Sequence, residues 1–287
     1  MQCTPGASRC SMKKFDIFFI DLDNTLVQHG RNEASERNIR ALKAAKEKGI
    51  SLCVATGRCR GLMPPAVREV GFDYALTANG CALYDLRDEK CVLRCGFSQE
   101  IAEKAYEIVR PELDFFELFV GGEIMVDRGE VDKINRMPLP KTHFEYFSWG
   151  KGIFDRSFEE YIHSGAETLE KFNCIVTPPP AMKKLRPLLE STGLYEVTAI
   201  ESKGVLEVLP KGCTKGQMIR DFCRLKGIKL ESCAAFGDGD NDIDMLQTAG
   251  TGVAMGSADA SVKAIADAVT GSVEEDGLAA FIEKEIL

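Results

Sequence analysis

The sequence predicts an α/β fold in which a doubly wound, mostly parallel sheet is interrupted by an inserted α+β domain. Apolar runs alternate with amphipathic helical stretches over residues 13–81 and again over residues 201–287. These runs are nearly unbroken, as in strands that are buried on both faces of a parallel sheet. Residues 82–200 instead show hairpin and short-helix patterns. One core domain, interrupted by this segment and then completed, accounts for all three observations.

The first part of the chain begins with a strand, a helix and a second strand. Residues 15–20 are apolar almost throughout. Ser35 can cap a helix whose apolar residues share one face, and Gly49 ends that helix before the apolar run at residues 50–56. A third run, at residues 74–80, completes the first half of the predicted sheet.

The segment from residue 82 to residue 200 is predicted to form a second domain of antiparallel α+β type. Its expected elements are a hairpin over 81–95, a helix over 100–113, two strands about Gly121 and Gly122, a helix over 158–172, a strand over 173–178, a helix over 182–190 and a strand near Tyr195. The parallel pattern then resumes with a helix from Thr214, a strand over 233–238, a helix after Asn241, a strand over 252–255 and a closing helix from Gly277.

Composition disfavours several classes of function. The 287 residues include 44 Asp and Glu against 36 Lys and Arg, and this net charge of -8 argues against a nucleic-acid partner. No apolar stretch is long enough to cross a membrane, and the N-terminal residues lack the continuous apolar core of a signal peptide, so the predicted location is the cytoplasm. The eleven cysteines are then expected to be reduced thiols. Residues 1–12 are expected to form a frayed tail.

Carboxylates gather where two predicted strands end. Asp21 and Asp23 follow the first strand, and Asp238, Asp240 and Asp242 lie at the end of a later one. Because open α/β sheets bind ligands beyond the carboxyl ends of their strands, these acids are expected near one another. Like charges so close would repel unless a cation or a proton relieved them. Hard oxygen ligands favour Mg²⁺, which also binds substrate phosphates, so a phosphoryl-binding site is predicted.

Four motifs resemble those of a known family. The stretches DLDNT (residues 21–25), VATGR (54–58), KGCTKG (211–216) and GDGDND (237–242) match, in order, the motifs of the haloacid dehalogenase-like (HAD) phosphatases. The insertion between the second and third motifs is similar to the type 2B cap of their Cof-like subfamily. The resemblance covers residues 13–287 and implies a HAD Rossmann-like core with a cap that sets substrate specificity.

The resemblance implies a role for each acid. Asp21 is expected to attack phosphorus as the nucleophile and to form an aspartyl-phosphate. Asp23 is expected to protonate the leaving group and then to activate water. The implied Mg²⁺ ligands are the Asp21 side chain, the Asp23 carbonyl and Asp238, with Asp242 helping mostly through water. Asp240 falls where the family is variable and is expected to be a solvated loop acid.

The remaining motif residues are expected to hold the substrate. Thr56 and Gly57 can offer a hydroxyl and a backbone N–H to a phosphoryl oxygen. Lys215, favoured over Lys211 by its place in the third motif, is expected to neutralise the phosphoryl group and Asp21. Further substrate contacts are assigned to Leu22, Arg58, Asn79 and Asn241. Alternatively, Arg58 could pair with a core acid, and Asn79 and Asn241 could each cap a helix.

Taken with the resemblance, the motifs predict a Mg²⁺-dependent phosphomonoester hydrolase that acts on small phosphorylated metabolites, above all sugar phosphates. A phosphosugar mutase of the phosphomannomutase type is an alternative, as is a sugar-phosphate sensor without catalysis. A receiver-type signalling module uses similar residues but lacks a proton shuttle such as Asp23 and has no large insertion. The expected partner is the small substrate alone, and the chain is expected to be a monomer or a weak homodimer.

Overall fold

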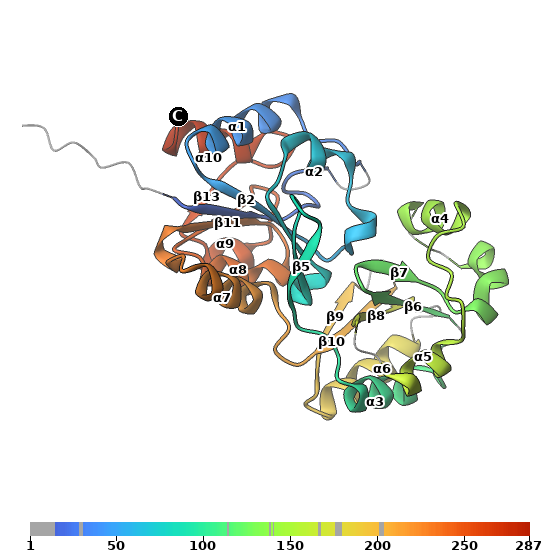
Figure 1. Ribbon diagram of the computed structural model, residues 1–287. Coiled ribbons are helices and arrows are strands. Elements are labelled where there is room, and N and C mark those ends of the chain that lie inside the picture. The colour runs from blue at the N-terminus through green and yellow to red at the C-terminus, as the bar shows by residue number, and fades with distance from the viewer. Residues whose placement is uncertain are drawn as a thin grey trace, which may run out of the picture.

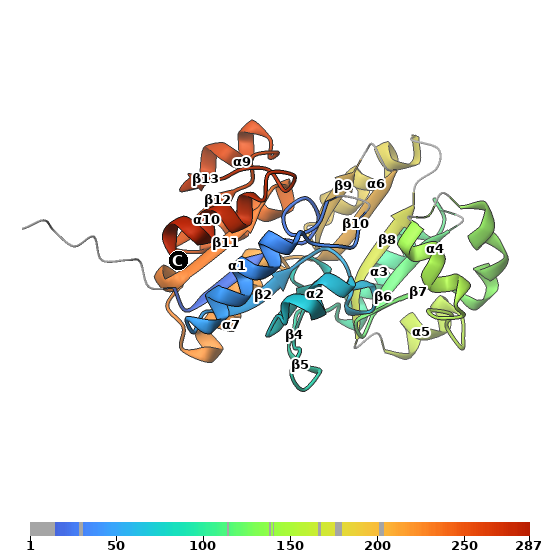
Figure 2. The ribbon, with the colours of Figure 1, turned by 90° about the horizontal axis from the view of Figure 1, so that it is seen from above.

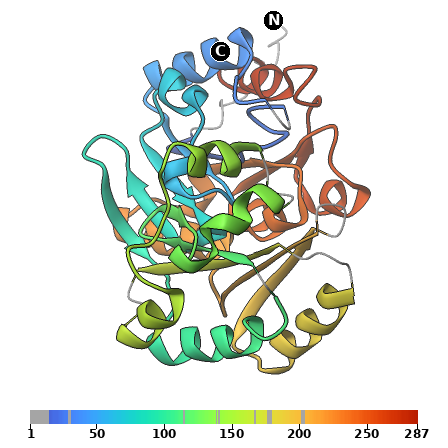
Figure 3. The same ribbon diagram turned by 90° about the vertical axis from the view of Figure 1, so that its right-hand side faces the viewer.

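The chain folds into two sheets with their own helices, which form two neighbouring units in a computed structural model (Figure 1). The structure describes residues 15–28, 31–113, 115–137, 139, 141–165, 168–175, 180–200 and 204–287, so the tail predicted at residues 1–12 lies outside it. Figure 2 shows the two units from above, and in Figure 3 the smaller unit faces the viewer. Among the described residues, no helix has the length and apolarity to cross a bilayer.

The larger sheet has eight strands in the order β13-β12-β11-β1-β2-β3-β4-β5. Its parallel strands are β1 (Ile17–Ile20), β2 (Ser51–Ala55), β3 (Tyr74–Thr77), β11 (Cys233–Gly237), β12 (Thr251–Ala254) and β13 (Ala268–Val269). An antiparallel hairpin extends one edge with β4 (Ala82–Asp85) and β5 (Lys90–Arg94). The doubly wound, mostly parallel sheet predicted from the sequence is confirmed.

Helices cover both faces of this sheet (Figure 1). One face carries α1 (Glu36–Glu47), α2 (Pro65–Val70) and α10 (Gly277–Glu285), and the other carries α7 (Lys215–Lys226), α8 (Ile243–Thr248) and α9 (Ala260–Ile265). Phe18 and Ile20 of β1 pack in the first of these cores, whereas Ile17 and Phe19 pack in the second. Two buried faces explain why this strand is apolar throughout.

The smaller sheet is antiparallel and has five strands in the order β7-β6-β8-β10-β9. Its strands are β6 (Phe116–Val120), β7 (Glu123–Met125), β8 (Leu169–Ile175), β9 (Tyr195–Ile200) and β10 (Val205–Pro210). One face packs on α3 (Gln99–Val109), α5 (Phe158–Ser164) and α6 (Pro180–Ser191). The unit also contains the 3₁₀ segment η3 (Arg128–Arg136) and α4 (Lys141–Ser148). The shorter 3₁₀ turns of the described residues are η1 (Arg60–Leu62), η2 (Ala78–Gly80), η5 (Leu230–Ser232) and η6 (Asp240–Asp242).

Strand pairing differs from the predicted division at both ends of the inserted segment. The hairpin of β4 and β5, predicted to open the second domain, instead continues the larger sheet, where Thr77 pairs with Ala82. The strand β10, predicted to lead back into the first domain, pairs with β8 and β9 in the smaller sheet. A strand's own residues do not specify which sheet it joins, because that depends on partners distant in sequence.

The helix predicted over residues 158–172 is wrong in its second half. The helix α5 ends at Ser164, and Gly165 follows it with a φ of 111°. From Leu169 the chain forms β8, the central strand of the smaller sheet, which is buried along its whole length. Glu170 and Lys171 favour a solvated helix surface in the sequence, but both are buried in the fold. Tertiary packing overrides the local pattern here.

Other local signals are confirmed. Ser35 caps α1, because its Oγ accepts a hydrogen bond from Asn38 N at 3.0 Å. Thr214 caps α7 in the same way, with Gln217 N as the donor at 3.1 Å. The turn between β6 and β7 uses Gly121 and Gly122, which have φ angles of 61° and 89° that favour glycine.

Two cysteines form a disulfide, against the expectation of reduced thiols. Cys95 follows β5 and Cys213 follows β10, so the bond joins the two connections between the sheets. The two residues are 118 positions apart in sequence, and the fold brings their Cα atoms to 6.0 Å. The other cysteines of the described residues are free, and only Cys91 among them is exposed.

We expect this disulfide to stabilise the fold. Closing so long a loop restricts the unfolded chain, and native disulfides typically contribute about 2–5 kcal/mol to the free energy of unfolding. Dithiothreitol should therefore lower the melting temperature of the wild-type protein, measured by differential scanning calorimetry. It should not change that of the C95S/C213S double variant. Equal melting temperatures for the oxidised and reduced wild-type protein would contradict this expectation.

Candidate active site

Three neighbouring strands end at the same edge of the larger sheet. In the parallel register, Ile20 of β1 lies opposite Val54 of β2 and Phe236 of β11. The residues that follow these positions are therefore neighbours in space. They include Asp21, Thr56 and Asp238, which the sequence places at three separate strand ends.

Three carboxylates and one lysine form a cluster at this edge. Oxygen atoms of Asp21, Asp238 and Asp242 lie within 4.8 Å of one another. The Lys215 ammonium donates to Asp21 Oδ1 at 2.7 Å and to Asp242 Oδ1 at 2.6 Å. Lys215 and Asp242 are each 1% exposed, and Asp21 is 6% exposed. Three acids and one base leave an excess of negative charge where little water reaches.

This excess of negative charge changes the pKa values of the cluster. Burial, followed by repulsion from Asp242, raises the pKa of Asp21 well above its usual range, although Lys215 opposes the shift. The same two causes raise the pKa of Asp238 to about 6. Burial by itself would lower the pKa of Lys215, but Asp21 and Asp242 outweigh it and the net shift is upward. A cation between the acids would relieve their repulsion.

The loop after β11 is built around the Asp242 side chain. Its Oδ2 accepts hydrogen bonds from the backbone N–H groups of Asp238 and Gly239, both at 3.0 Å. Gly237 lies so close that a Cβ there would come within 2.5 Å of Asp242 Cγ. The carboxylate at position 242 therefore requires a glycine at position 237, which explains part of the spacing of the GDGDND stretch.

Asp23 and Arg58 form a second polar group beside the cluster. Arg58 Nε and Nη2 donate to the two carboxylate oxygens of Asp23, at 3.1 and 2.6 Å. The backbone N–H of Arg58 donates to Thr56 Oγ1 at 3.1 Å, which leaves the hydroxyl proton of Thr56 for another acceptor. Arg58 thus pairs with an acid of the site and not with a core acid, and it also lines the cavity. The two-point contact fixes the orientation of the Asp23 carboxylate.

A cavity of about 510 Å³ lies between the two sheets, and the acid cluster is at its floor. The predicted site residues that line it are Asp21, Asp23, Thr56, Gly57, Arg58, Asn79, Asp238 and Asn241. Lys215 and Asp242 are buried beneath them. The Leu22 side chain is also buried, in the core of the larger sheet, so only the backbone of Leu22 could make the substrate contact predicted for this residue.

Asp240 and Lys211, which the sequence analysis left out of the predicted site, both lie outside the acid cluster. Asp240 is exposed at the cavity rim, as expected for a loop acid. Lys211 is exposed and pairs with Glu196 of β9 at 2.9 Å, so it does not compete with Lys215 for the acids.

The smaller sheet and α4 contribute cavity residues that the sequence analysis did not find. They are Phe119, Thr142, His143, Lys171, Asn173, Thr198, Ala199, Val205 and Glu207. In the sequence, Glu207 stands out only as a charged residue inside an otherwise apolar strand, VLEVLP at residues 205–210. Such a charge is buried only when it is paired, and its partners are distant in sequence.

A chain of hydrogen bonds crosses from one sheet to the other at this cavity. Lys171 Nζ donates to the Gly57 carbonyl at 2.9 Å and also to Glu207. Asn79 Nδ2 donates to Glu207 at 2.7 Å, and Asn241 Nδ2 donates to Asn79 Oδ1 at 3.0 Å. Both predicted asparagines therefore bind other side chains here, and the smaller sheet is anchored on the loops that surround the acid cluster.

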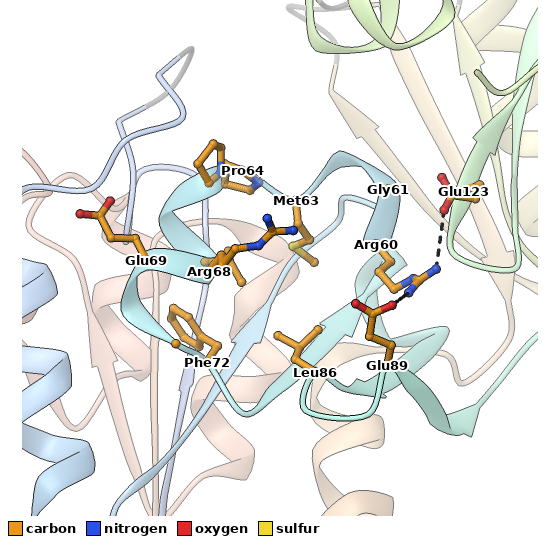
Figure 4. A pocket seen from close by; sticks show the side chains of 13 residues that line it. Arg60, Gly61, Met63, Pro64, Arg68, Glu69, Phe72, Leu86, Glu89 and Glu123 are labelled. Carbon is orange, nitrogen blue, oxygen red and sulfur yellow. Dashed lines mark ion pairs between the residues drawn. The ribbon is translucent and has the colours of Figure 1, made fainter. Parts of the chain in front are cut away.

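A second and larger cavity, of about 700 Å³, lies against α2 and the turn between β4 and β5 (Figure 4). In it Arg60 extends toward Glu89 and Glu123, with N···O distances of 3.7 and 3.8 Å. None of the residues that line it belongs to the acid cluster. The position of the acid cluster therefore favours the smaller cavity as the active site, despite its smaller volume.

The chain is similar to proteins of known family along most of its length. The model of the haloacid dehalogenase-like hydrolase family matches residues 18–282. Phosphatase YwpJ of Bacillus subtilis (strain 168) is 29% identical over 285 residues, covering 92% of this chain and 97% of that protein. Pyridoxal phosphate phosphatase YbhA of Escherichia coli (strain K12) is 29% identical over 280 residues, covering 94% and 98%. The solved structure of HAD subclass IIB sugar phosphatase BT4131 matches with a TM-score of 0.73 and 28% identity, over 94% of this chain and 98% of that one.

Proposed function

The chain belongs to the haloacid dehalogenase-like hydrolases, in their Cof-like subfamily, and we propose from this premise that it is a Mg²⁺-dependent phosphatase of small phosphorylated metabolites, above all sugar phosphates. The observation that carries the proposal is the position of Asp21. Its carboxylate lies at the floor of the cavity, 2.7 Å from Lys215 Nζ and beside the oxygens of Asp238 and Asp242. A nucleophile, a cation that offsets its charge and hard oxygen donors thus meet at one point.

In the proposed reaction an oxygen of Asp21 attacks phosphorus and the ester oxygen departs, which leaves an aspartyl-phosphate. Asp23, held by Arg58, gives a proton to the departing oxygen and then takes one from the water that hydrolyses the intermediate. The Thr56 hydroxyl donates to a phosphoryl oxygen from the cavity wall. Lys215 offsets the negative charge that Asp21 and the phosphoryl group bring together.

Mg²⁺ fits the acid cluster, because the donors are all oxygens and the acids repel one another without a cation. We propose the side chains of Asp21 and Asp238 and the carbonyl of Asp23 as its ligands. Asp242 is proposed to contact the ion only through water, since Lys215 and two backbone N–H groups already occupy its oxygens. The bound ion would neutralise charge on the phosphoryl oxygens.

The affinity for Mg²⁺ is expected to fall as the pH is lowered. Burial and Asp242 raise the pKa of Asp238 to about 6, so a proton competes with the metal ion below that pH. We expect binding to be weaker by at least about tenfold at pH 5 than at pH 7, measured by isothermal titration calorimetry. The D238N variant should bind weakly at both pH values. An affinity of the wild-type protein that does not change over this range would contradict the assignment of Asp238 as a ligand.

The substrate class rests on the relatives and on the cavity. One relative is named for pyridoxal phosphate and one structural neighbour for sugar phosphates, both of them small phosphate esters. A cavity of about 510 Å³ suits a ligand of that size. Location in the cytoplasm and assembly as a monomer or a weak homodimer stay predictions from the sequence.

Phosphate release from a panel of sugar phosphates, nucleotides, phospho-amino acids and cofactor phosphates tests the proposal. We expect turnover of at least one small monoester with Mg²⁺, and none with excess EDTA until Mg²⁺ is restored. Formation of an isomerised sugar phosphate without free phosphate would favour the mutase instead. Binding of a compound without any turnover in the presence of Mg²⁺ would favour the sensor.

A further inference from the structure

The face of the smaller sheet that lines the cavity carries a row of polar side chains. Cross-strand pairing places Glu117 of β6 opposite Asn173 of β8, and Asn173 opposite Glu207 of β10. Glu207 in turn lies opposite Thr198 of β9. Because side chains alternate along a strand, the row shares one face, and the intervening residues pack on the helices behind the sheet. Glu117 is fully buried in this row.

His143 of α4 is held by the end of this row. Its Nδ1 lies 3.2 and 2.9 Å from the two carboxylate oxygens of Glu117, and Asn173 Nδ2 donates to Glu117 Oε2 at 2.6 Å. A carboxylate at this distance requires a hydrogen on Nδ1, which leaves Nε2 for a different partner. The His143 ring lines the cavity, and no hydrogen bond to Nε2 is found within the described part of the chain. The Phe119 ring lies next to it, with the ring centroids 6.5 Å apart.

The cationic side chains that line this cavity are already paired. Among the described lining residues, the lysine and arginine side chains are Arg58, which binds Asp23, and Lys171, which binds Glu207. No unpaired Lys or Arg among the described lining residues is therefore left to hold a second phosphate or a carboxylate. Such an anion would also meet the negative charge of Glu117 behind His143.

Building on the phosphatase function proposed above, we infer that His143 Nε2 binds a hydroxyl group of the leaving group. Glu117 and Asn173 are positioning residues that hold the ring, and the neighbouring Phe119 ring offers an apolar surface to a sugar or a similar ring. The protein thus prefers monophosphates of neutral, hydroxyl-bearing compounds. It discriminates against bisphosphates and phosphorylated carboxylic acids.

Two substitutions of His143 separate the roles of its ring nitrogens. In H143N the amide can replace Nδ1 toward Glu117 but does not reach the place of Nε2, whereas in H143Q it reaches that place. The measured quantity is the ratio of kcat/KM for glucose 6-phosphate to kcat/KM for p-nitrophenyl phosphate, whose leaving group carries no further hydroxyl. Loss of one hydrogen bond should lower this ratio about tenfold in H143N, mainly through KM for the sugar phosphate. The ratio should fall by no more than about threefold in H143Q.

Matched variants complete the test. His163 of α5 is an exposed histidine of the smaller unit, and H163N should keep the wild-type ratio. E117Q weakens the hold on Nδ1, so it should raise KM for glucose 6-phosphate about threefold and leave kcat unchanged, a split that a general structural defect would not produce. Melting temperatures measured beside each assay show whether the variants are folded.

The outcomes distinguish this inference from the function on which it rests. An H143N ratio equal to that of the wild type would overturn the inference, as would faster turnover of fructose 1,6-bisphosphate than of glucose 6-phosphate. In either case the phosphatase function would stand. If folded wild-type protein with Mg²⁺ releases phosphate from no monoester, p-nitrophenyl phosphate included, the proposed function falls and the inference falls with it.

Discussion

Substitution of Asp21 by asparagine is expected to lower kcat by at least about 10⁴-fold, because an amide cannot accept the phosphoryl group. Steady-state phosphate release measures the loss. The fold should be retained, since asparagine has nearly the same shape and the repulsion among the acids becomes weaker. Residual turnover within about tenfold of the wild-type rate would rule out Asp21 as the nucleophile.

The other end of the same strand supplies the control for this variant. Asp16 lies just before β1 on the exposed surface, where it accepts a hydrogen bond from Ser232 Oγ at 2.6 Å. We expect D16N to keep kcat within about twofold of the wild-type value, because exposed substitutions far from a site have small effects. A similar loss of kcat in D16N and D21N would mean that kcat reflects the stability of β1 and not the chemistry of Asp21.

Replacement of Lys215 by methionine is expected to damage both the rate and the stability. Without the ammonium, Asp21 and Asp242 face each other in a buried site, and removing one partner of a buried ion pair typically costs about 3–5 kcal/mol. Protonation of the acids will offset part of that cost. We expect kcat to fall about 10³-fold and the free energy of unfolding in EDTA, measured with urea, to fall by about 3 kcal/mol.

Lys211 provides the matched control, four residues earlier in the same motif. Its exposed ammonium pairs only with Glu196 among the described residues, and surface pairs contribute little. K211M is therefore expected to change the free energy of unfolding by less than about 1 kcal/mol and to leave kcat unchanged. If K215M behaves like K211M, the buried cluster does not need its lysine.

Sequence reasoning predicted the parallel sheet well because its signals are local. A strand buried on both faces reads as a continuous apolar run, and β1 shows this directly, since Phe18 and Phe19 pack in different cores. The caps at Ser35 and Thr214 are equally local, because each depends on a residue three positions away. Asp21, Thr56 and Asp238 could be placed together for the same reason, as parallel strands end at a common edge.

The smaller sheet could not be predicted so well, because its pattern depends on distant partners. Glu117 and Asn173 are 56 residues apart, and only the folded sheet pairs them. The charges in β8 suggested a helix surface, although Lys171 is neutralised within the cavity by Glu207. In the acid cluster, likewise, the sequence predicted the contact of Lys215 with Asp21 but not its second contact with Asp242. A buried charge can be predicted only when its partner is known, and these partners are distant in sequence.

Trapping the phosphorylated enzyme tests the central claim most directly. Wild-type protein with Mg²⁺ and a turned-over substrate is quenched in acid, treated with borohydride to reduce the acyl phosphate, and digested for mass spectrometry. We predict that the aspartate at position 21 is converted to homoserine, and that no other carboxylate is converted. Rapid phosphate release without conversion at position 21, or conversion at a different aspartate, would contradict the account.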